Sequence, residues 1–282
     1  MEGIQKTLDI RSCSLQKEAL LSLFDILNAK AVDIANFTAN RLERLEDELE
    51  DDYVRVQDEI RDDMQLNVLI RLNNGQWHRS DSRESLSGLI DTYGSIIVFI
   101  EYESAFKFRS RAKKPPVNQF VVDLDLSKQE VFDIIGKAAD TINSSTGIVE
   151  GDNKDWVNGT YKELEEFFDL HSAPYSFIHK KISYDIAIWL FGIPVILAWT
   201  YKISLLIGDE LEKAAEIISI ATYIYLFTVL LFLFRILFNY VRFVFPKVEG
   251  PRHPNKGPWI HRFTLGTFII SMFAGLFINI NF

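Results

Sequence analysis

The sequence is poor in the residues and motifs on which most catalytic sites are built. It contains a single cysteine, Cys13, among 282 residues, which excludes a disulfide within the chain and any cysteine-rich metal site. The five histidines do not follow HExxH or another zinc-binding spacing. A glycine-rich phosphate loop, a GxSxG motif and a Cys/His pair are missing as well. We therefore expect no enzyme activity, no catalytic residue, no metal and no cofactor.

Basic residues are scarce in the first 178 positions. This part contains 20 Lys and Arg against 33 Asp and Glu, a net charge of −13, whereas residues 179–282 contain 10 against 6, a net charge of +4. An acidic domain is repelled by phosphate backbones, so general nucleic-acid binding is not expected. The first ten residues, MEGIQKTLDI, have neither a basic nor an apolar segment, and we expect no cleaved signal peptide.

Long apolar runs are confined to the last hundred residues. Three of them lie near residues 184–207, 217–240 and 263–282. A helix that crosses about 30 Å of hydrocarbon needs roughly 20 mostly apolar residues. The pattern therefore predicts a three-helix transmembrane region within residues 179–282, and with it a lipid membrane as a partner. Pro194 is expected to kink the first span, because proline lacks the N–H that a helix needs.

Lysine and arginine in the flanks of the spans predict their orientation. Basic residues precede the first span and lie between the second and third, namely Lys180, Lys181, Arg242, Lys247, Arg252, Lys256 and Arg262. The connection between the first two spans is acidic instead. We therefore predict a multi-pass protein of the bacterial inner membrane, with its N-terminal domain in the cytoplasm and its C-terminus outside.

The part before the spans is predicted to be an acidic helical region, residues 1–65, followed by an α+β cytoplasmic domain, residues 66–178. Apolar residues three and four apart predict helix over Leu15–Met64, with a break near Asn36–Asn40. Alternating apolar and polar residues, with a turn at Asn73–Gly75, predict a small antiparallel sheet with one wet face. Its expected strands are Leu66–Leu72, Gln76–Arg79, Ser95–Tyr102 and Val117–Leu126.

Two capping boxes predict the remaining helices of this domain. Ser127 with Glu130 is expected to open a helix to about Ile142, and Thr160 with Glu163 another to about Leu170. The segment between them, residues 143–159, is rich in Ser, Gly and Asn and is expected to be a loop.

A dense acidic run lies between Arg41 and Asp63, where 11 Asp and Glu accompany four Arg. Such a run is typical of a solvated helix face. The alternative is that this acidic helix packs against a second copy of itself or covers a pore mouth.

Two acidic pairs, Glu101/Glu103 and Asp123/Asp125, invite a metal interpretation. Carboxylates one residue apart on a strand point the same way, which suits Mg²⁺ in phosphoryl or nucleotidyl transfer. The stretch VVDLDLS is similar to the acidic strand of nucleotidyltransferases, but the Gly-Ser pair which that family needs shortly upstream is not in place. Alternation on a solvent-facing strand surface explains both pairs equally simply.

A basic cluster stands out in this otherwise acidic domain, between two predicted strands. Its members are Lys107, Arg109, Arg111, Lys113 and Lys114. Because Phe106 and Phe108 interleave with these charges, we interpret the cluster as a candidate site for an anionic ligand such as a nucleotide signal, for a partner, or for lipid headgroups. The alternative is a solvated hairpin tip that balances the local acid.

Polar residues in and around the spans are candidates for lining a pore or its rim. The acidic connection and two hydroxyl residues form the first set: Asp209, Glu210, Glu212, Glu216, Ser204 and Thr222. Arg235 and Asp185 lie near the predicted cytoplasmic ends of the spans, where they either snorkel to the surface or line a pore mouth. Three spans enclose too little space for a pore, so conduction requires a homo-oligomer.

The order of these parts resembles the membrane effectors of bacterial anti-phage, abortive-infection systems, such as the Hailong-type effectors. The shared features are the acidic helical region at Leu15–Met64, the sheet, and the spans from Tyr184, and the resemblance covers the whole chain as a layout. It implies an oligomeric channel that is closed by a helical lid and controlled by a partner nucleotidyltransferase. Once a nucleotide-derived signal or a partner opens such a channel, the membrane is depolarised.

Three functional hypotheses follow. The first is a homo-oligomeric channel or pore-forming effector gated by its cytoplasmic domain. The second is a membrane-anchored interaction protein that recruits or regulates a soluble partner enzyme without conducting ions. The third, weaker one is a membrane-tethered nucleotide enzyme that uses Asp123 and Asp125.

Overall fold

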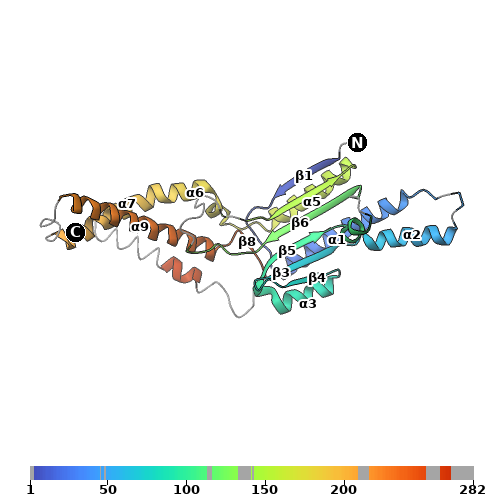
Figure 1. The fold of residues 1–282 in the computed structure, drawn as a ribbon, viewed down its shortest axis with the longest axis horizontal. Helices are drawn as coiled ribbons and strands as arrows, with labels where there is room; N and C mark the ends of the chain where they lie inside the picture. Colours follow the sequence, from blue (N-terminus) through green and yellow to red (C-terminus); the bar gives the residue numbers. More distant parts are fainter. Residues whose placement is uncertain are drawn as a thin grey trace. The chain divides into compact units, whose positions relative to one another are not determined.

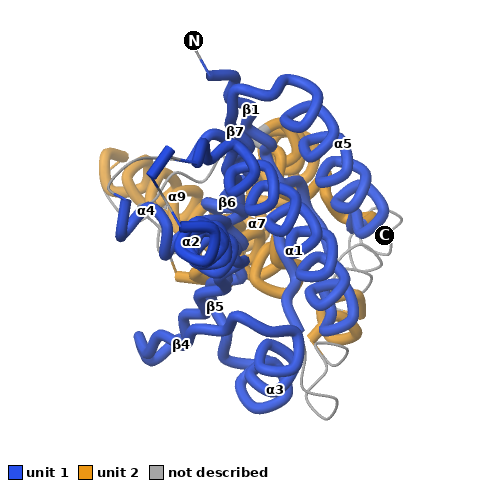
Figure 2. Tube along the Cα trace, turned by 90° about the vertical axis from the view of Figure 1, so that its right-hand side faces the viewer, with its two compact units in different colours: residues 1–127, 143–173, 248–256 blue, residues 128–142, 174–247, 257–282 orange. Residues whose placement is uncertain are grey.

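A computed structural model describes residues 3–44, 46–47, 49–112, 116–132, 141, 143–208, 216–251 and 261–267. Its chain divides into two compact units, which Figure 2 colours separately. The α+β unit comprises residues 1–127, 143–173 and 248–256, and the span unit comprises residues 128–142, 174–247 and 257–282. Residues 248–256, which follow the second span, therefore belong with the α+β unit.

The α+β unit is built on a six-stranded antiparallel sheet (Figure 1). The strand order is β1-β7-β6-β5-β3-β4, and every neighbouring pair is antiparallel. The bounds are β1 Ile4–Asp9, β3 Asn67–Leu72, β4 Trp77–Ser80, β5 Ile97–Glu103, β6 Asn118–Asp125 and β7 Thr146–Gly151. All four predicted strands are present, within two residues of their expected ends.

The turn between β3 and β4 forms where the Asn-Asn-Gly sequence predicts it. Gly75 has a φ of 84°, which residues with a Cβ rarely adopt. The Asn74 side chain accepts a hydrogen bond of 3.0 Å from the backbone of Gln76, so it fixes the turn from within.

One face of the sheet carries the hydrophobic core of the α+β unit. Helices α1 (Lys17–Asn40), α3 (Arg83–Tyr93) and α5 (Lys154–Leu170) supply apolar residues to it. Figure 2 shows α1 and α5 on the same side of the strands. Along β6 every second residue is buried, and Tyr102 of β5 donates a hydrogen bond of 3.2 Å to the Leu20 carbonyl of α1. The other face is the wet one that alternation predicts.

The prediction of a loop over residues 143–159 is wrong, because these residues contain β7 and the start of α5. The Ser and Gly content hid this strand. Gly151 is needed because a Cβ there would lie 2.0 Å from the Asn118 side-chain oxygen on β6. Strand β1, which was not predicted either, forms the sheet edge by pairing with β7. The predicted boundary at residue 65 thus falls inside one compact unit.

Helix α5 begins at Lys154, six residues before the predicted start at Thr160. Its N-cap is Asn153, whose side-chain oxygen accepts hydrogen bonds from the backbones of Asp155 and Trp156. Thr160 lies buried inside the helix. The other capping box also fails, because Ser127 bonds to Asp125 and residues 127–132 are not helical. Residues 133–140 of that predicted helix lie outside the described residues.

Helix α1 runs without interruption to Asn40. The helix therefore ends after the segment Asn36–Asn40, in which an interruption was predicted. Helix α2 (Glu50–Asp63) then returns alongside the end of α1. A second small sheet pairs β2 (Cys13–Ser14) with β8 (Val248–Glu249) in parallel, and it holds the segment after the second span against the α+β unit.

The span unit contains two helices that are long and apolar enough to cross a membrane, Ile182–Leu206 and Glu216–Val244. The first is composed of α6 (Lys181–Ile186), a π-helical turn (Ala187–Gly192) and α7 (Ile193–Leu206), and the second is α9. Pro194 cannot donate to the preceding helical turn, and the π-helical turn lies directly before it. Of the third predicted span, residues 261–267 are helical and residues 268–282 lie outside the described residues.

Candidate functional site

The predicted basic cluster forms a short helix, α4 (Phe106–Ala112), which follows β5. Lys107 is exposed on it, whereas Lys113 and Lys114 lie outside the described residues. Phe108 packs against the core, and Phe106 lies under the guanidinium of Arg79, 4.5 Å from ring centre to charge. Both aromatic rings of the cluster are thus engaged within the chain.

Arg109 of α4 forms an ion pair with Glu103, the last residue of β5. The sequence pattern placed Glu103 on a solvent-facing surface, but the residue is 4% exposed. A buried carboxylate is costly unless a cation or hydrogen-bond donors accompany it. Arg109 therefore compensates a buried charge and fastens α4 to the sheet.

Arg111 joins α4 to the acidic helix α2. Its guanidinium lies 3.0 Å from Glu59 and 3.1 Å from Asp63. We call these three residues the clasp. The acidic run and the basic cluster, which the sequence presents as separate features, are thus partners in one chain, and two of the three described cations of the cluster are paired with carboxylates.

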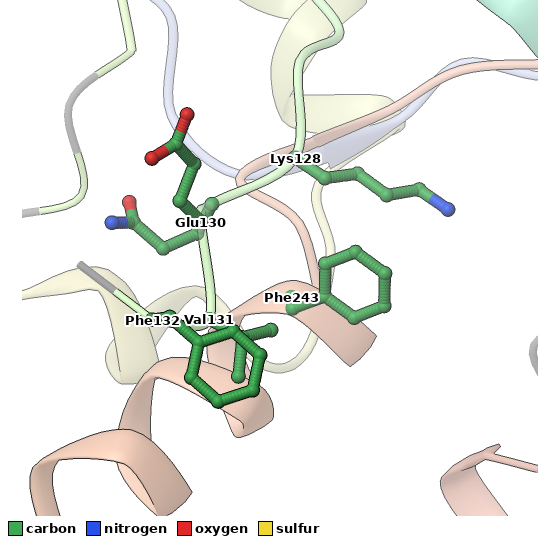
Figure 3. A pocket seen from close by; sticks show the side chains of 6 residues that line it. Lys128, Glu130, Val131, Phe132 and Phe243 are labelled. Atoms are coloured by element: carbon green, nitrogen blue, oxygen red, sulfur yellow. The ribbon is translucent and has the colours of Figure 1, made fainter.

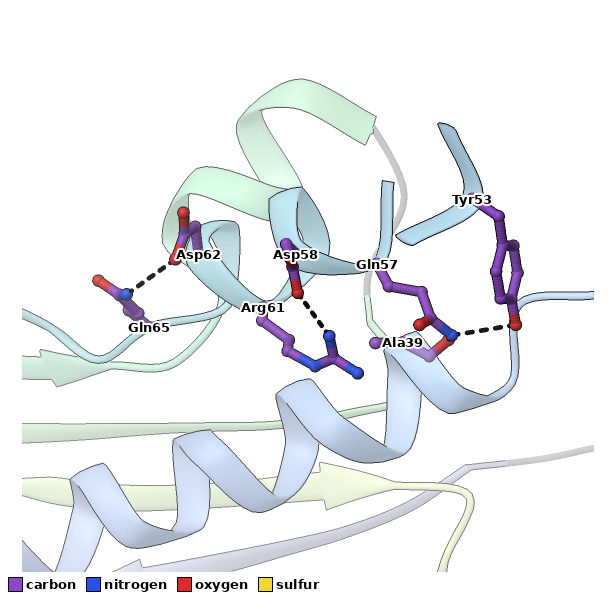
Figure 4. A network of polar contacts seen from close by, with 7 residues as sticks. All are labelled: Ala39, Tyr53, Gln57, Asp58, Arg61, Asp62 and Gln65. Atoms are coloured by element: carbon purple, nitrogen blue, oxygen red, sulfur yellow. Dashed lines mark hydrogen bonds and ion pairs between the residues drawn. The ribbon is translucent and has the colours of Figure 1, made fainter. Parts of the chain in front are cut away.

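Helix α2 is attached to the rest of the α+β unit through several polar contacts and through Ile60, which is partly buried against the hydrophobic core. It has no buried residue. Figure 4 shows how its side chains meet the end of α1, where Gln57 donates to the Ala39 carbonyl over 3.1 Å. Tyr53 donates to the Leu42 carbonyl over 2.9 Å. Exposed ion pairs contribute about 0–1 kcal/mol each, so α2, which buries no residue completely, is held more weakly than α1 with its ten buried apolar residues.

The predicted acidic pairs are rearranged by the sheet register. Glu101 on β5 lies directly opposite Asp123 on β6. Burial, and then the neighbouring Glu101, raise the pKa of Asp123 to about 6. Burial also raises the pKa of Glu101, although Arg109 opposes this shift. Both shifts favour the protonated forms of these two carboxyl groups, which face each other across β5 and β6.

Asp125, the other member of its pair, is engaged differently. It accepts hydrogen bonds from the backbones of Ser127 and Ser144, over 3.0 and 3.2 Å, and so ties together the two ends of the β6–β7 connection. Within the described residues, no group of three or more His, Cys, Asp or Glu is placed to hold a metal ion.

The wet face also carries an aromatic group that the sequence interpretation missed. Arg71 of β3 lies over two rings, 5.6 Å from Trp77 and 5.5 Å from Phe99. The two rings meet edge to face with centroids 6.3 Å apart, and Trp77 is largely exposed. The sequence did contain a signal for this group, because alternation along the strands assigns Arg71 and Phe99 to the solvent side of the sheet.

Two of the polar candidates in these helices, Ser204 and Thr222, donate their hydroxyl hydrogens to backbone carbonyls of the same helix. Ser204 is buried and donates to the Tyr201 carbonyl over 2.7 Å, and Thr222 donates to Ile218 over 2.9 Å. Glu216 begins α9 and is exposed, and Asp185 lies in α6 and Arg235 in α9. Asp209, Glu210 and Glu212 lie outside the described residues.

Helices α7 and α9 pack closely through small residues. A Cβ on Gly192 would lie 3.1 Å from the Phe234 ring of α9. Buried Ile196, Thr200 and Ser204 continue the same side of α7 at intervals of four residues. Large apolar side chains occupy the outside of α7, of the π-helical turn before it and of α9, and are exposed in the chain, among them Trp189, Leu190, Leu197, Leu205, Ile217 and Ile224.

A polar cluster lies where the C-terminal end of α9 meets the residues that precede α6. Arg242 of α9 is 1% exposed and donates to the Ile178 carbonyl, and its guanidinium lies over the Phe238 ring. His179 is buried beside it and bonds to Thr141 over 2.8 Å. Burial, and then the charge of Arg242, lower the pKa of His179 to about 4, so the ring is neutral at physiological pH.

Comparisons with protein families, with curated proteins and with solved structures found no match for this chain.

Proposed function

We propose that this protein is an oligomeric membrane channel or pore-forming effector that is gated by its α+β unit. The observation that carries the proposal is the inverted burial in α7 and α9. Their outer surfaces consist of exposed large apolar residues, while Thr200, Ser204 and Asn239 are buried. Such helices are stable only where hydrocarbon or other helices replace water.

Conduction requires several copies of the chain. Two or three spans enclose too little space for a water-filled path, so we propose a homo-oligomer of three-span subunits with the third span at residues 263–282. The acidic residues between the first two spans would then form an outer rim that favours cations. The basic flanks of the spans support our proposal that the N-terminal unit lies in the cytoplasm.

Control by the α+β unit is proposed to act through the clasp. Helix α2 buries no residue, and Arg111 pairs with its Glu59 and Asp63. An anionic signal or a partner that competes for Arg111 would release α2 at a small energetic cost. The layout shared with abortive-infection effectors supports a role in anti-phage defence, in which opening depolarises the bacterial inner membrane.

Ion flux from proteoliposomes tests the channel. The purified oligomer is reconstituted with a fluorescent ion indicator, and wild type is compared with Arg111→Glu, which repels α2. We expect faster flux in the variant, and we expect Arg83→Glu, which breaks another exposed ion pair, with Asp25, to behave like wild type. A verified oligomer that conducts in neither state, with or without added nucleotide signals, would contradict the proposal.

A membrane-anchored interaction protein is the second candidate, and the wet face of the sheet favours it. The exposed Trp77, with Arg71 and Phe99 beside it, has the aromatic and arginine composition of an interface centre. A photo-crosslinker at position 77 tests this candidate in cells. Crosslinks to a soluble protein, together with no flux, would favour recruitment of a partner enzyme over conduction.

A further inference from the structure

The β6–β7 connection leaves the α+β unit and contributes a cavity to the span unit. The cavity has a volume of about 460 Å³ and is lined by Lys128, Gln129, Glu130, Val131, Phe132 and Phe243. Lys128–Ile142 is grouped with the span unit, although this segment starts three residues after the end of β6 and ends shortly before β7. Two contacts hold it there: the Lys128 ammonium lies 5.2 Å from the Phe243 ring centre, and Thr141 bonds to His179.

The length of α9 indicates the depth of this cavity in a bilayer. Its 29 residues make a helix about 43 Å long at 1.5 Å per residue. Hydrocarbon accounts for about 30 Å of a bilayer, and the headgroup layers bring the total to about 40–45 Å. Phe243 is the penultimate residue of α9, so in an upright helix it lies at headgroup depth, on the same side as Arg235 and Arg242.

The lining is amphipathic in the way that this depth requires. Val131, Phe132 and Phe243 provide apolar surface, and Phe132 is 78% exposed although it is large and apolar. Lys128 places its ammonium over the cavity, and Figure 3 shows the Glu130 carboxylate on the other side of the connection, away from Phe243. Exposed aromatic rings beside a lysine are typical of segments that rest in a membrane interface.

We infer that this cavity takes a membrane phospholipid, with its phosphate at Lys128 and its glycerol and upper acyl chain against Phe132 and Phe243. The occupant is a lipid because the exposed ring of Phe132 lines the cavity together with Phe243 of α9, and because Lys128 lies beside Phe243, at the depth of the phosphates. The inference rests on the proposed insertion of α9. Its consequence is that the connection between the sheet's central strands β6 and β7 reports the state of the membrane surface.

Three cysteine variants of the full chain, each labelled with a fluorophore, test this inference. Cys13 is buried, so labelled wild type serves as the blank. Phe132→Cys probes the cavity, Leu205→Cys probes the span, and Leu49→Cys is the matched control, because Leu49 is 71% exposed but belongs to the α+β unit. Proteoliposomes of phosphatidylcholine and phosphatidylglycerol carry nitroxide lipids, labelled on the headgroup or on the acyl chain, as quenchers.

We expect the headgroup nitroxide to quench the label at position 132 at least about threefold more than the label at position 49. Lys128→Glu should at least halve that quenching, whereas Lys154→Glu, at an exposed lysine of the α+β unit, should leave it unchanged. Phe243→Cys gives a second reporter if the Phe132 variant does not fold.

The possible failures are distinguishable. If the acyl-chain nitroxide fails to quench position 205, the chain is not inserted, and the proposed function falls together with the inference. If position 205 is quenched while position 132 behaves like position 49, only the inference is overturned. Energy transfer between labels at position 132 without lipid quenching would identify a second copy as the occupant, which also overturns it. An unchanged signal in Lys128→Glu removes the phosphate site.

Discussion

Helices α1 and α9 are both long and rich in apolar residues. Helix α1 buries its apolar side chains, whereas α9 exposes many of its large ones. Helix α1 buries ten residues, all of them apolar, and turns its charges outward. Helix α9 buries three, of which Asn239 and Arg242 are polar, and turns its large apolar side chains outward. The same rule governs both helices, because each side chain faces the medium that suits it.

We therefore expect different contributions to the free energy of folding to stabilise the two units. Removal of apolar area from water stabilises the α+β unit. In the membrane location that we propose for α7 and α9 that term is small, and close packing and hydrogen bonds would take its place. Matched substitutions in the two units should therefore change stability by amounts that differ in sign and size.

The largest expected effect is in the core of the α+β unit. Leu27→Ala removes a fully buried side chain of α1 and should lower the free energy of unfolding by about 2–5 kcal/mol. Leu205→Ala removes the same atoms from the outside of α7 and should leave the unfolding of the α+β unit unchanged. Urea denaturation in detergent, followed by circular dichroism, measures both. Equal losses would mean that Leu205 belongs to a water-excluded core.

A charge on the outer surface of each helix tests the medium directly. Ile224→Asp in α9 should cost about 2.5–3.5 kcal/mol of insertion and reduce the fraction of chain that resists carbonate extraction. Val32→Asp on the exposed side of α1 should change stability by no more than about 0.5 kcal/mol. If Ile224→Asp is as harmless as Val32→Asp, the outside of α9 faces water.

Close packing of α7 on α9 predicts a steric effect at glycine. Gly192→Val places its side chain against Phe234 and should cost about 1–3 kcal/mol, lowering the melting temperature of the span unit in detergent. Gly208→Val is the control, because among the described residues none lies within 4 Å of a Cβ at that position. A span unit that melts at the wild-type temperature in Gly192→Val would argue against the packing.

Neutralising Asp123 and neutralising Asp125, both on β6, should change the stability of the α+β unit in opposite directions. The pKa of Asp123 rises from 3.8 to about 6 on folding, so folding takes up a proton and stability falls as pH rises from about 4 through 6. Asp123→Asn should therefore stabilise the α+β unit at pH 7 by up to about 1 kcal/mol, discounted for solvent screening, and the gain should vanish below about pH 4.

Asp125→Asn should instead destabilise the unit by about 0.5–1.5 kcal/mol, because Asp125 accepts hydrogen bonds from Ser127 and Ser144. Denaturation of both variants across the pH range provides the comparison. A pH-independent gain in Asp123→Asn would contradict the burial of the carboxylate.

The smallest expected effect on stability is at the clasp. Arg111→Glu should lower the unfolding free energy by only about 1 kcal/mol, since Arg111 and Glu59 are about half-exposed, although the Asp63 side chain is 15% exposed. The backbone amides of α2 should nevertheless exchange with deuterium faster, while those of α1 keep their rates. Unchanged exchange in α2 would mean that its contacts with α1 hold it without Arg111.

Local patterns predicted much of this fold, and their failures share a cause. Alternation along β3, β5 and β6 predicted three strands and the wet face, because period-two burial depends on adjacent residues. Strand β7 was missed because its glycines suggested a loop, although Gly151 serves a contact with Asn118 on another strand. Thr160 and Glu163 fit a capping box by spacing alone, and Asn153 is the residue that caps the helix.

The sequence by itself determined the antiparallel strands, the apolar span helices and the division between an acidic part and a membrane-like part. Those properties follow from composition and from residues a few positions apart. The tertiary structure alone decided that Arg111 meets Glu59 and Asp63, that Glu101 lies against Asp123, and that Lys128 reaches Phe243. These pairs join residues far apart in the chain, and only strand register and helix packing bring them together.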